Sequence, residues 1–472
     1  MRTFLNENFL LPNEAAERLY NEYVKDMSIF DGKSEKCEGE IMKPVKILQF
    51  GGGNFLRCFF DWMLQRVSDT TGIEYEVTLA QLTPGEPVFD IAAAKEYHVL
   101  LRGYEGTQYV ETLDAVRVIK NAVSPLEKPA EYIEAGCEDI SLILSNSTEA
   151  GIFFDPAATH NYSSATHNYP SRLAMLLEYR ARKHLPPVMI MAMELNDRSG
   201  DLLKKTLLQY GQSFAYGMEF FNYIESCSFY NTLVDRIVPG YPADAADRVF
   251  EKIGHQDQWL TSGELFHLFV IEGDRKILDV IPFDQAGLNV IVTDDKLDFY
   301  HGRKVRILNG AHTASVPVAL LNGIENVDVF ASHPEYSAWL SEMTHKEICR
   351  AMDDSTETHA YADDVLARFK NPALGHSFRS IALNSVAKVN ARMRPTLVDY
   401  FSKEGCLPPL MTEAIGKMCE LYGGSGVVEL PGGALELKDF SQIHGLSLSE
   451  RLESFFPGLS AEIQRALLHE LS

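Results

Sequence analysis

Residues 45–57 read VKILQFGGGNFLR, in which three consecutive glycines separate two apolar segments. The first six residues have the length and apolar content of a buried strand, and apolar residues recur at helical spacing from Leu56 to Val67. Between them, Gly51 and Gly53 would let the backbone approach a pyrophosphate at the helix N-terminus. Leu56 replaces the third glycine of the usual fingerprint, so a tight turn without a ligand stays open as an alternative. We predict cofactor contacts at Phe50, Gly51, Gly52, Gly53, Asn54 and Phe55.

The pattern that follows this turn predicts two domains. Strand-like apolar runs cover residues 77–82, 140–144 and 188–193. Helical periodicity covers residues 173–182 and 201–210, and such alternation argues for a parallel α/β sheet. After about residue 295 helical periodicity takes over, apart from a small hairpin expected at Val427–Leu437. We predict an α/β Rossmann-type N-terminal domain over residues 1–295, which begins with a charged helical segment, and a mainly α-helical C-terminal domain over residues 296–472.

Composition narrows the classes of protein. The 472 residues carry a formal charge of −23, which repels nucleic acids and anionic membranes. The apolar stretches are shorter than the roughly 18 residues that a membrane span needs, and the pattern of residues 1–20 does not predict a secretory signal. The seven cysteines form no Cys-x-x-Cys pair. We therefore expect a cytoplasmic protein without a nucleic-acid partner, a membrane partner or a metal site, and a solvated loop at the repeated ATHNY of residues 158–169.

Polar clusters follow two of the predicted strands. The clusters occupy residues 145–151 and 194–197, and ligands of open α/β sheets bind beyond the carboxyl ends of the strands. We predict cofactor contacts at Ser145, Asn146 and Glu149, although a helix cap is the alternative. Residues 81–86, which follow the second strand, contain no basic side chain for a 2′-phosphate. NAD is therefore favoured over NADP.

A second motif lies at the start of the helical half. In an α-helix Lys304, Asn309 and His312 would point to about 0°, 140° and 80°, on one side of the axis. A lysine, an amide and an imidazole that converge on a cleft could supply a base, a hydrogen-bond donor and an orienting group. The alternative is an exposed lysine beside a packed asparagine and histidine. A base also requires a lysine pKa below its ordinary value, which burial or a nearby cation such as a charged His312 would provide.

The spacing Lys304-x-x-x-x-Asn309-x-x-His312, together with the turn at residues 51–57, resembles the signature of the mannitol dehydrogenase family, also called the polyol-specific long-chain dehydrogenases. Residues 231–239 and 368–372 resemble further segments of this family. Within the family, residues 48–57, 148–152 and 380–385 resemble the tagaturonate reductase (altronate oxidoreductase) branch.

The resemblance implies an enzyme with NAD as its cofactor and a small hexuronate or aldonate as its substrate. It implies metal-free hydride transfer between D-tagaturonate and D-altronate, in a cleft between the two domains. Lys304 would be the general acid/base, and Asn309 and His312 would position the substrate oxygens. The alternatives are a fructuronate reductase, a mannitol-type polyol dehydrogenase, or a sugar-acid sensor without catalytic activity.

A uronate carboxylate needs a cation, for which arginine or lysine is suited. The candidates are Arg57, Lys388 and Arg392, of which the last two lie four residues apart on one face of a predicted helix. The alternative is that they are solvated surface charges. The resemblance aligns Leu195 with an asparagine that mannitol dehydrogenases have at the substrate. The neighbouring Asn196 is therefore the candidate to contact the substrate there.

Overall fold

The strand predicted at residues 45–50 lies inside an eight-stranded sheet of the computed structural model, which describes residues 43–160 and 168–472. In spatial order the strands are β11 (Val290–Thr293), β10 (Leu268–Glu272), β8 (Ser228–Asp235), β7 (Met189–Ala192), β6 (Ile140–Ser145), β1 (Val45–Phe50), β2 (Tyr75–Ala80) and β5 (Ile119–Val123). All neighbours pair in parallel except β10 and β8. The predicted parallel α/β sheet is confirmed. The helical segment expected at the N-terminus and most of the ATHNY repeat lie outside the described residues.

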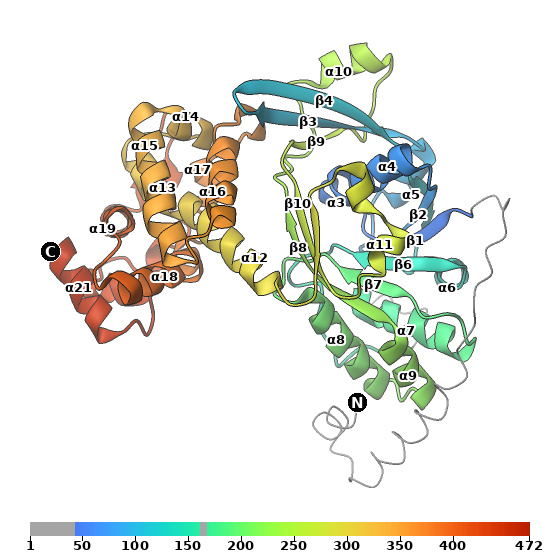
Figure 1. Ribbon diagram of the computed structural model, residues 1–472. Helices are drawn as coiled ribbons and strands as arrows, with labels where there is room; N and C mark the ends of the chain where they lie inside the picture. Colours follow the sequence, from blue (N-terminus) through green and yellow to red (C-terminus); the bar gives the residue numbers. More distant parts are fainter. Residues whose placement is uncertain (1–42, 161–167) are drawn as a thin grey trace, which may run out of the picture. The chain divides into compact units, whose positions relative to one another are not determined.

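Helices cover both faces of this sheet, which explains why its central strands are apolar throughout. They are α3 (Asn54–Cys58), α4 (Phe60–Thr71), α5 (Val88–Ala94), α6 (Pro129–Gly136), α7 (Tyr169–Arg182), α8 (Ser199–Ser213), α9 (Met218–Ser226) and α11 (Ile277–Val280). The remaining helix of this part, α10 (Ala246–Ile253), packs elsewhere, against Leu100 and Leu260. In Figure 1, α4 lies on one side of the sheet and α8 on the other. Phe59 and Phe60 pack edge-on against Phe269 of β10, so this core joins the helices after the glycine turn to the far half of the sheet.

A second, three-stranded sheet has the order β4-β3-β9, with β3 at Tyr97–Glu105, β4 at Gln108–Val116 and β9 at Thr261–Glu264. β3 pairs antiparallel with β4 and parallel with β9. The hairpin of β3 and β4 is not predicted from the sequence, because β4 is mostly half-buried or exposed and carries polar residues between its apolar ones. The sheet brings Glu264 of β9 toward the helical part of the chain.

Beyond β11 the chain is mainly helical, as predicted. The helices are α12 (Leu297–Arg303), η3 (Lys304–Asn309), α13 (Gly310–Leu321), α14 (Val327–Ser332), α15 (Pro334–Glu342), η4 (Met343–Cys349), α16 (Thr356–Phe369), α17 (Phe378–Ile381), α18 (Ser385–Glu404), α19 (Pro409–Gly423), α20 (Leu448–Phe455) and α21 (Ala461–Leu471). The predicted hairpin is confirmed as β12 (Val427–Val428) and β13 (Leu435–Glu436). No helix of the described part of the chain is long and apolar enough to cross a membrane.

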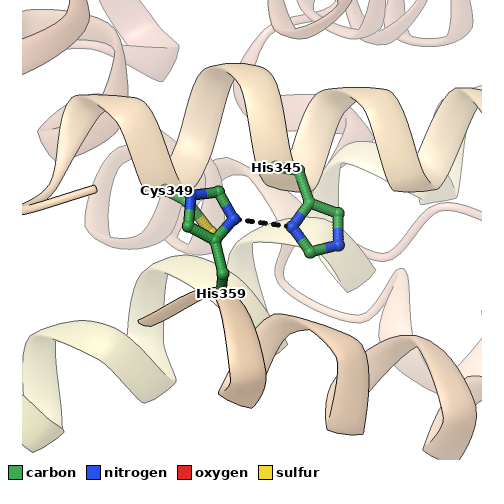
Figure 2. Close-up of side chains that lie close together, drawn as sticks. All are labelled: His345, Cys349 and His359. Carbon is green, nitrogen blue, oxygen red and sulfur yellow. Dashed lines mark hydrogen bonds between the residues drawn. The ribbon is translucent and has the colours of Figure 1, made fainter. Parts of the chain in front are cut away.

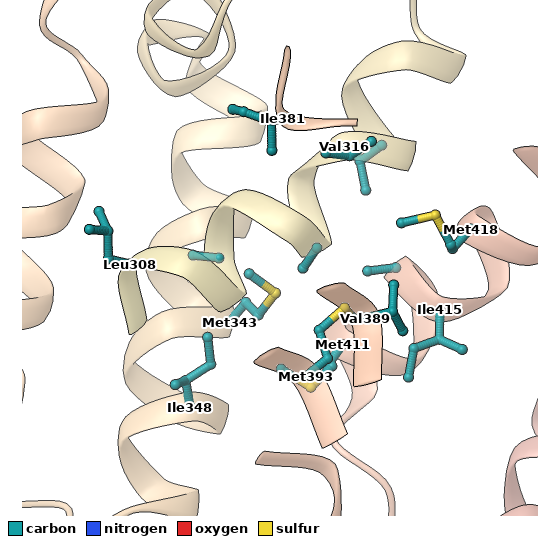
Figure 3. Close-up of a cluster of buried hydrophobic side chains, with 14 of the residues drawn as sticks. Leu308, Val316, Met343, Ile348, Ile381, Val389, Met393, Met411, Ile415 and Met418 are labelled. Atoms are coloured by element: carbon teal, nitrogen blue, oxygen red, sulfur yellow. The ribbon is translucent and has the colours of Figure 1, made fainter. Parts of the chain in front are cut away.

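The core of this helical part is built around α13. Val316 of α13 and Leu308 of η3 are buried in the same cluster as Met343, Met393 and Met411, which come from η4, α18 and α19 (Figure 3). η3 and η4 are both π-helical turns that interrupt otherwise α-helical segments. Such turns occur often at functional sites.

Candidate active site

The glycine turn has the backbone that a close approach requires. Gly51 has φ +100°, a conformation that favours glycine. Gly53 precedes α3 without a side-chain cap, and a Cβ added there would meet no described atom within 4 Å. The space beside Gly53 and the uncapped N–H groups of α3 therefore fit a dinucleotide phosphate. The prediction of helical structure from Leu56 onward is wrong in one respect, because Phe59 divides the helix into α3 and α4.

Glu86 braces the turn from the segment after β2, a role that the sequence analysis does not assign. The Gly52 N–H donates to Glu86 Oε1 over 3.0 Å, and the Leu82 N–H donates to Glu86 Oε2 over 2.8 Å. The Glu86 carboxylate therefore lies at the glycine turn. Like the absence of basic residues from positions 81–86, this carboxylate disfavours the additional 2′-phosphate of NADP.

Arg57 is buried and holds the turn together. Its guanidinium donates to Gly52 O over 3.1 Å and to Asn54 Oδ1 over 2.6 Å, and it also donates to Trp259 O. Its charge lies over the rings of Tyr97 and Trp259. Because its donors are used inside the fold, the geometry favours a structural role for Arg57 in place of the predicted substrate contact.

Phe50 also faces the protein interior. Its side chain has no exposed surface and its ring packs against Tyr132 and Tyr169, at centroid distances of 6.1 and 4.7 Å. Any contact from this residue to a cofactor would therefore come from its backbone.

The loop after β6 is held by Glu194, which is buried at the end of β7. Ser145 donates to Glu194 Oε2 over 3.1 Å, and both the N–H and the hydroxyl of Ser147 donate to Oε1 over 2.9 Å. Asn146 donates to Met193 O over 2.6 Å. The two polar clusters predicted at neighbouring strand ends thus form one hydrogen-bonded unit.

Asn196 belongs to the same unit rather than to the pocket wall. Its Nδ2 donates to Glu149 O over 2.9 Å, and its buried Oδ1 has no hydrogen-bond partner in the described structure. Leu195, at the position of the family asparagine, is 60% exposed and lines the pocket described next. Asn196 therefore positions the backbone of Glu149.

A cavity of about 740 Å³ joins these segments to the helical half of the chain. Its wall includes Phe55 from the glycine turn, Asn146 and Glu149 from the loop after β6, Val234 from β8, and Lys304 from η3. Three of the predicted cofactor residues and the predicted general acid/base thus line one pocket. The volume suits a small ligand, since ligand pockets run from about 300 to 1,000 Å³.

Lys304 begins the π turn η3, in which hydrogen bonds join residue i to residue i+5. Lys304 and Asn309 therefore stand at the two ends of a single turn. Lys304 Nζ donates to Val234 O at the end of β8 over 2.7 Å. Burial lowers the pKa of Lys304, and the charge of Arg368 lowers it further against the opposing effect of Asp235.

Behind Lys304 lies a buried ionic network that the sequence analysis missed. Arg368 of α16 donates to both oxygens of Asp235, at 2.8 and 3.2 Å, and to both oxygens of Glu264, at 2.8 and 2.9 Å. Tyr361 donates to Asp235 Oδ2 over 2.6 Å. Burial raises the pKa of Asp235, but the Arg368 charge and the attached hydrogen bonds outweigh it and leave the pKa below its ordinary value.

His312 is buried on α13 and stacks on Phe369, with ring centroids 4.0 Å apart and His376 at 4.8 Å. Burial and the neighbouring cations hold the pKa of His312 well below its ordinary value, so the imidazole is neutral. The expectation that a charged His312 depresses the pKa of Lys304 is therefore wrong, because Arg368 and Arg392 supply that positive charge. The buried Nε2 of His312 has no partner in the described residues and can serve a ligand.

The two predicted carboxylate-binding cations lie on α18. Arg392 donates to Thr313 Oγ1 over 3.2 Å, and its charge contributes to lowering the pKa of both Lys304 and His312. Arg392 is also drawn electrostatically to Glu149 of the cofactor-side loop. Lys388, one turn away, donates to Ile381 O over 2.9 Å. Of these two predicted cations, Arg392 is thus the one that interacts with the candidate acid/base.

Family models match most of the chain. The model of the mannitol dehydrogenase Rossmann domain matches residues 45–280, and the model of the mannitol dehydrogenase C-terminal domain matches residues 296–442. Two solved structures share the fold. A D-sorbitol dehydrogenase in substrate-free form has a TM-score of 0.76 at 20% identity, over 90% of this chain and 93% of that one. The mannitol 2-dehydrogenase of Pseudomonas fluorescens, in a ternary complex with NAD and D-mannitol, has a TM-score of 0.66 at 18% identity, over 91% of each chain.

Curated relatives are similar over comparable lengths. The altronate oxidoreductase of Phocaeicola vulgatus is 34% identical over 423 residues, which are 88% of this chain and 87% of that protein. The altronate oxidoreductase of Bacillus subtilis is 35% identical over 386 residues, which are 80% of each chain. The predicted fold class and the predicted oxidoreductase with a Rossmann-type NAD domain are confirmed. The chain belongs to the mannitol dehydrogenase family.

Proposed function

We propose that this chain is an NAD-dependent oxidoreductase that interconverts D-tagaturonate and D-altronate. The observation that carries the proposal is that Lys304 lines one pocket with Phe55, Asn146 and Glu149, the residues that fit the cofactor. The relatives with altronate oxidoreductase activity in their names support the choice of substrate.

When bound, NAD would supply the hydride acceptor or donor of this reaction, and the side chains handle the proton. Lys304 takes the hydroxyl proton during oxidation and returns it during reduction. Its lowered pKa makes the neutral amine available at a lower pH than for an ordinary lysine. The carbonyl of Val234 holds the ammonium form by accepting a hydrogen bond over 2.7 Å.

The neighbouring groups are proposed to bind the substrate. The neutral imidazole of His312 offers its unpartnered Nε2, and Asn309 offers an amide at the far end of the π turn. Arg392 offers a cation for the uronate carboxylate, with Lys388 one turn away. The charge of Arg392, which acts on Lys304, supports a sugar acid over a neutral polyol as the substrate.

The test is NADH absorbance with a panel of tagaturonate, fructuronate and fructose. We expect tagaturonate to give the highest kcat/KM. In Lys304→Ala we expect kcat to fall by about 10²–10⁴, because a general acid/base contributes that much, while NADH binding remains. The exposed Lys296 gives a matched control, and Lys296→Ala should keep wild-type kcat. Binding of tagaturonate without turnover in the wild type would refute the proposal in favour of a sensor, and preference for fructuronate or fructose would refute the substrate.

A further inference from the structure

Two histidines and a cysteine converge where η4 faces α16. His345 and Cys349 lie four residues apart on η4, and His359 lies in the first turns of α16 (Figure 2). One potential ligand atom from each residue lies within 4.8 Å of the other two. None of the three is among the residues that line the described pocket with Lys304, so the cluster is separate from the candidate active site.

The hydrogen bonds of the two imidazoles determine which nitrogens face each other. His345 Nε2 lies 3.1 Å from Asp363 Oδ1, and His359 Nε2 lies 2.9 Å from Asp354 Oδ1. A carboxylate accepts, so each Nε2 carries the hydrogen and each Nδ1 is left with its lone pair. The two Nδ1 atoms nevertheless lie 2.8 Å apart, with the rings nearly parallel. Two lone pairs at this distance repel each other unless a cation lies between or beside them.

The third group selects the cation. Cys349 has no exposed surface, and its Sγ lies 3.9 Å from Thr358 O, which is a weak contact for a thiol. Sulfur and imidazole nitrogen are the ligands that zinc prefers, usually in a tetrahedral arrangement. In metal sites the second nitrogen of a ligating histidine typically donates to a carboxylate, which is the arrangement of Asp354 and Asp363 here. A shared proton would satisfy the two nitrogens but would leave the sulfur without a role.

We propose that His345 Nδ1, His359 Nδ1 and Cys349 Sγ bind a Zn²⁺ ion, with water as the fourth ligand. The thiol proton of Cys349 is released when the thiolate binds. Side chains of His345 and His359 are 23% and 34% exposed, so the ion can enter from solvent. Three protein ligands from two helices fit an ion that joins η4 to α16. Since α16 also carries Arg368 and Tyr361, the ion would stabilise the helix that supports the network behind Lys304.

From the sequence no metal site is expected, because these ligands lack the paired-cysteine spacing. The sequence does contain one pattern that could indicate a metal site. His345-x-x-x-Cys349 places two side chains on one side of a helix, and His359 follows ten residues further on. That spacing alone is common in helices. The carboxylate partners of both histidines become visible only in the folded chain.

The test uses Co²⁺ as a spectroscopic probe on the full-length protein after treatment with a chelator. We expect one equivalent of Co²⁺ to bind and to give the absorption of a tetrahedral cobalt thiolate, which Zn²⁺ then removes. Cys349→Ser should abolish the thiolate band. Two controls should retain it: Cys419→Ser, which changes a buried cysteine of α19, and His255→Gln, which changes a second cluster of possible ligands around His98.

A second pair of variants keeps the proposal falsifiable if Cys349→Ser does not fold. Asp354 and Asp363 are mostly exposed, so their asparagine variants should fold normally. Each should weaken Co²⁺ binding by about 10–100-fold, as substitutions of such outer partners do. Absence of a thiolate band in the wild type, or an unchanged Co²⁺ affinity in both asparagine variants, would overturn the metal site and leave a shared proton between the imidazoles.

Discussion

Arg368→Met would leave two buried carboxylates without their cation. Asp235 and Glu264 have side chains that are each 2% exposed, and Arg368 itself is 4% exposed. The substitution removes four hydrogen bonds of 2.8–3.2 Å and keeps most of the side-chain volume. Breaking a buried ion pair by removing one partner costs about 3–5 kcal/mol, because the remaining charge stays desolvated. We expect a loss of free energy of unfolding in this range or above it, since two carboxylates share the arginine.

The loss should depend on pH in a predictable direction. Without Arg368, burial raises the pKa of both carboxyl groups in the folded variant, whereas the unfolded chain keeps values of about 3.9 and 4.3. A raised pKa in the folded state contributes stability below the unfolded pKa, and this contribution disappears as pH rises through the folded pKa. The difference in free energy of unfolding between wild type and variant should therefore be smallest below about pH 4 and should grow toward neutral pH.

The measurement is urea unfolding at several pH values, followed by circular dichroism. Arg303→Met is the matched control, because Arg303 is also buried but pairs with the largely exposed Glu357 and packs on the ring of Tyr361. We expect the control to lose at most about 2 kcal/mol, the value of a desolvated cation–π contact, with the pH dependence of the wild type. If Arg368→Met loses no more than Arg303→Met, or if its deficit does not grow with pH, the network is not the stabilising element inferred here.

Three further predictions concern the site. Because burial lowers the pKa of Lys304 from 10.5, kcat for altronate oxidation should rise with pH through an apparent pKa below that value, and kcat for tagaturonate reduction should fall over the same range. Two flat pH profiles would exclude Lys304 as the proton carrier. Arg392→Met should raise the KM for tagaturonate about 10–100-fold, the value of a charge-assisted hydrogen bond, and leave the KM for fructose unchanged; Lys388→Met should have a smaller effect. Wild-type kcat/KM should be higher with NADH than with NADPH, and Glu86→Gln should narrow the difference; equal values in the wild type would contradict the assignment of Glu86.

The sequence predicts those parts of the fold in which burial produces a recognisable pattern of apolar residues. The strand at residues 45–50 has the same limits in the structure, because a central parallel strand is covered on both faces and reads as a continuous apolar run. The hairpin of β3 and β4 has no such trace on its second strand. Its polar residues remain in contact with solvent, so the pattern resembles that of a loop.

The same reasoning explains what the sequence leaves out of the site. A local motif can identify Lys304 and the glycine turn, but it does not show which residues an arginine side chain contacts. The sequence allows Arg57 to be either a ligand contact or a surface charge. In the structure it is buried against Trp259, more than 200 residues away in the chain. The partners of Arg368 are also far away in the chain, at 133 residues for Asp235 and 104 for Glu264.

The two π turns refine what a helical wheel predicts for this chain. With α-helical geometry Lys304 and Asn309 lie on one side of the helix but point about 140° apart. In η3 the i to i+5 hydrogen bonding brings the two residues to the ends of one turn, so both can face the same ligand. η4 widens the helix in the same way at His345 and Cys349. A π turn has weaker backbone geometry than an α-helix and needs packing to persist, which the methionine-rich core around α13 supplies on the buried side of both turns (Figure 3). The buried core thus maintains the local geometry that the proposed proton transfer and the proposed metal site both require.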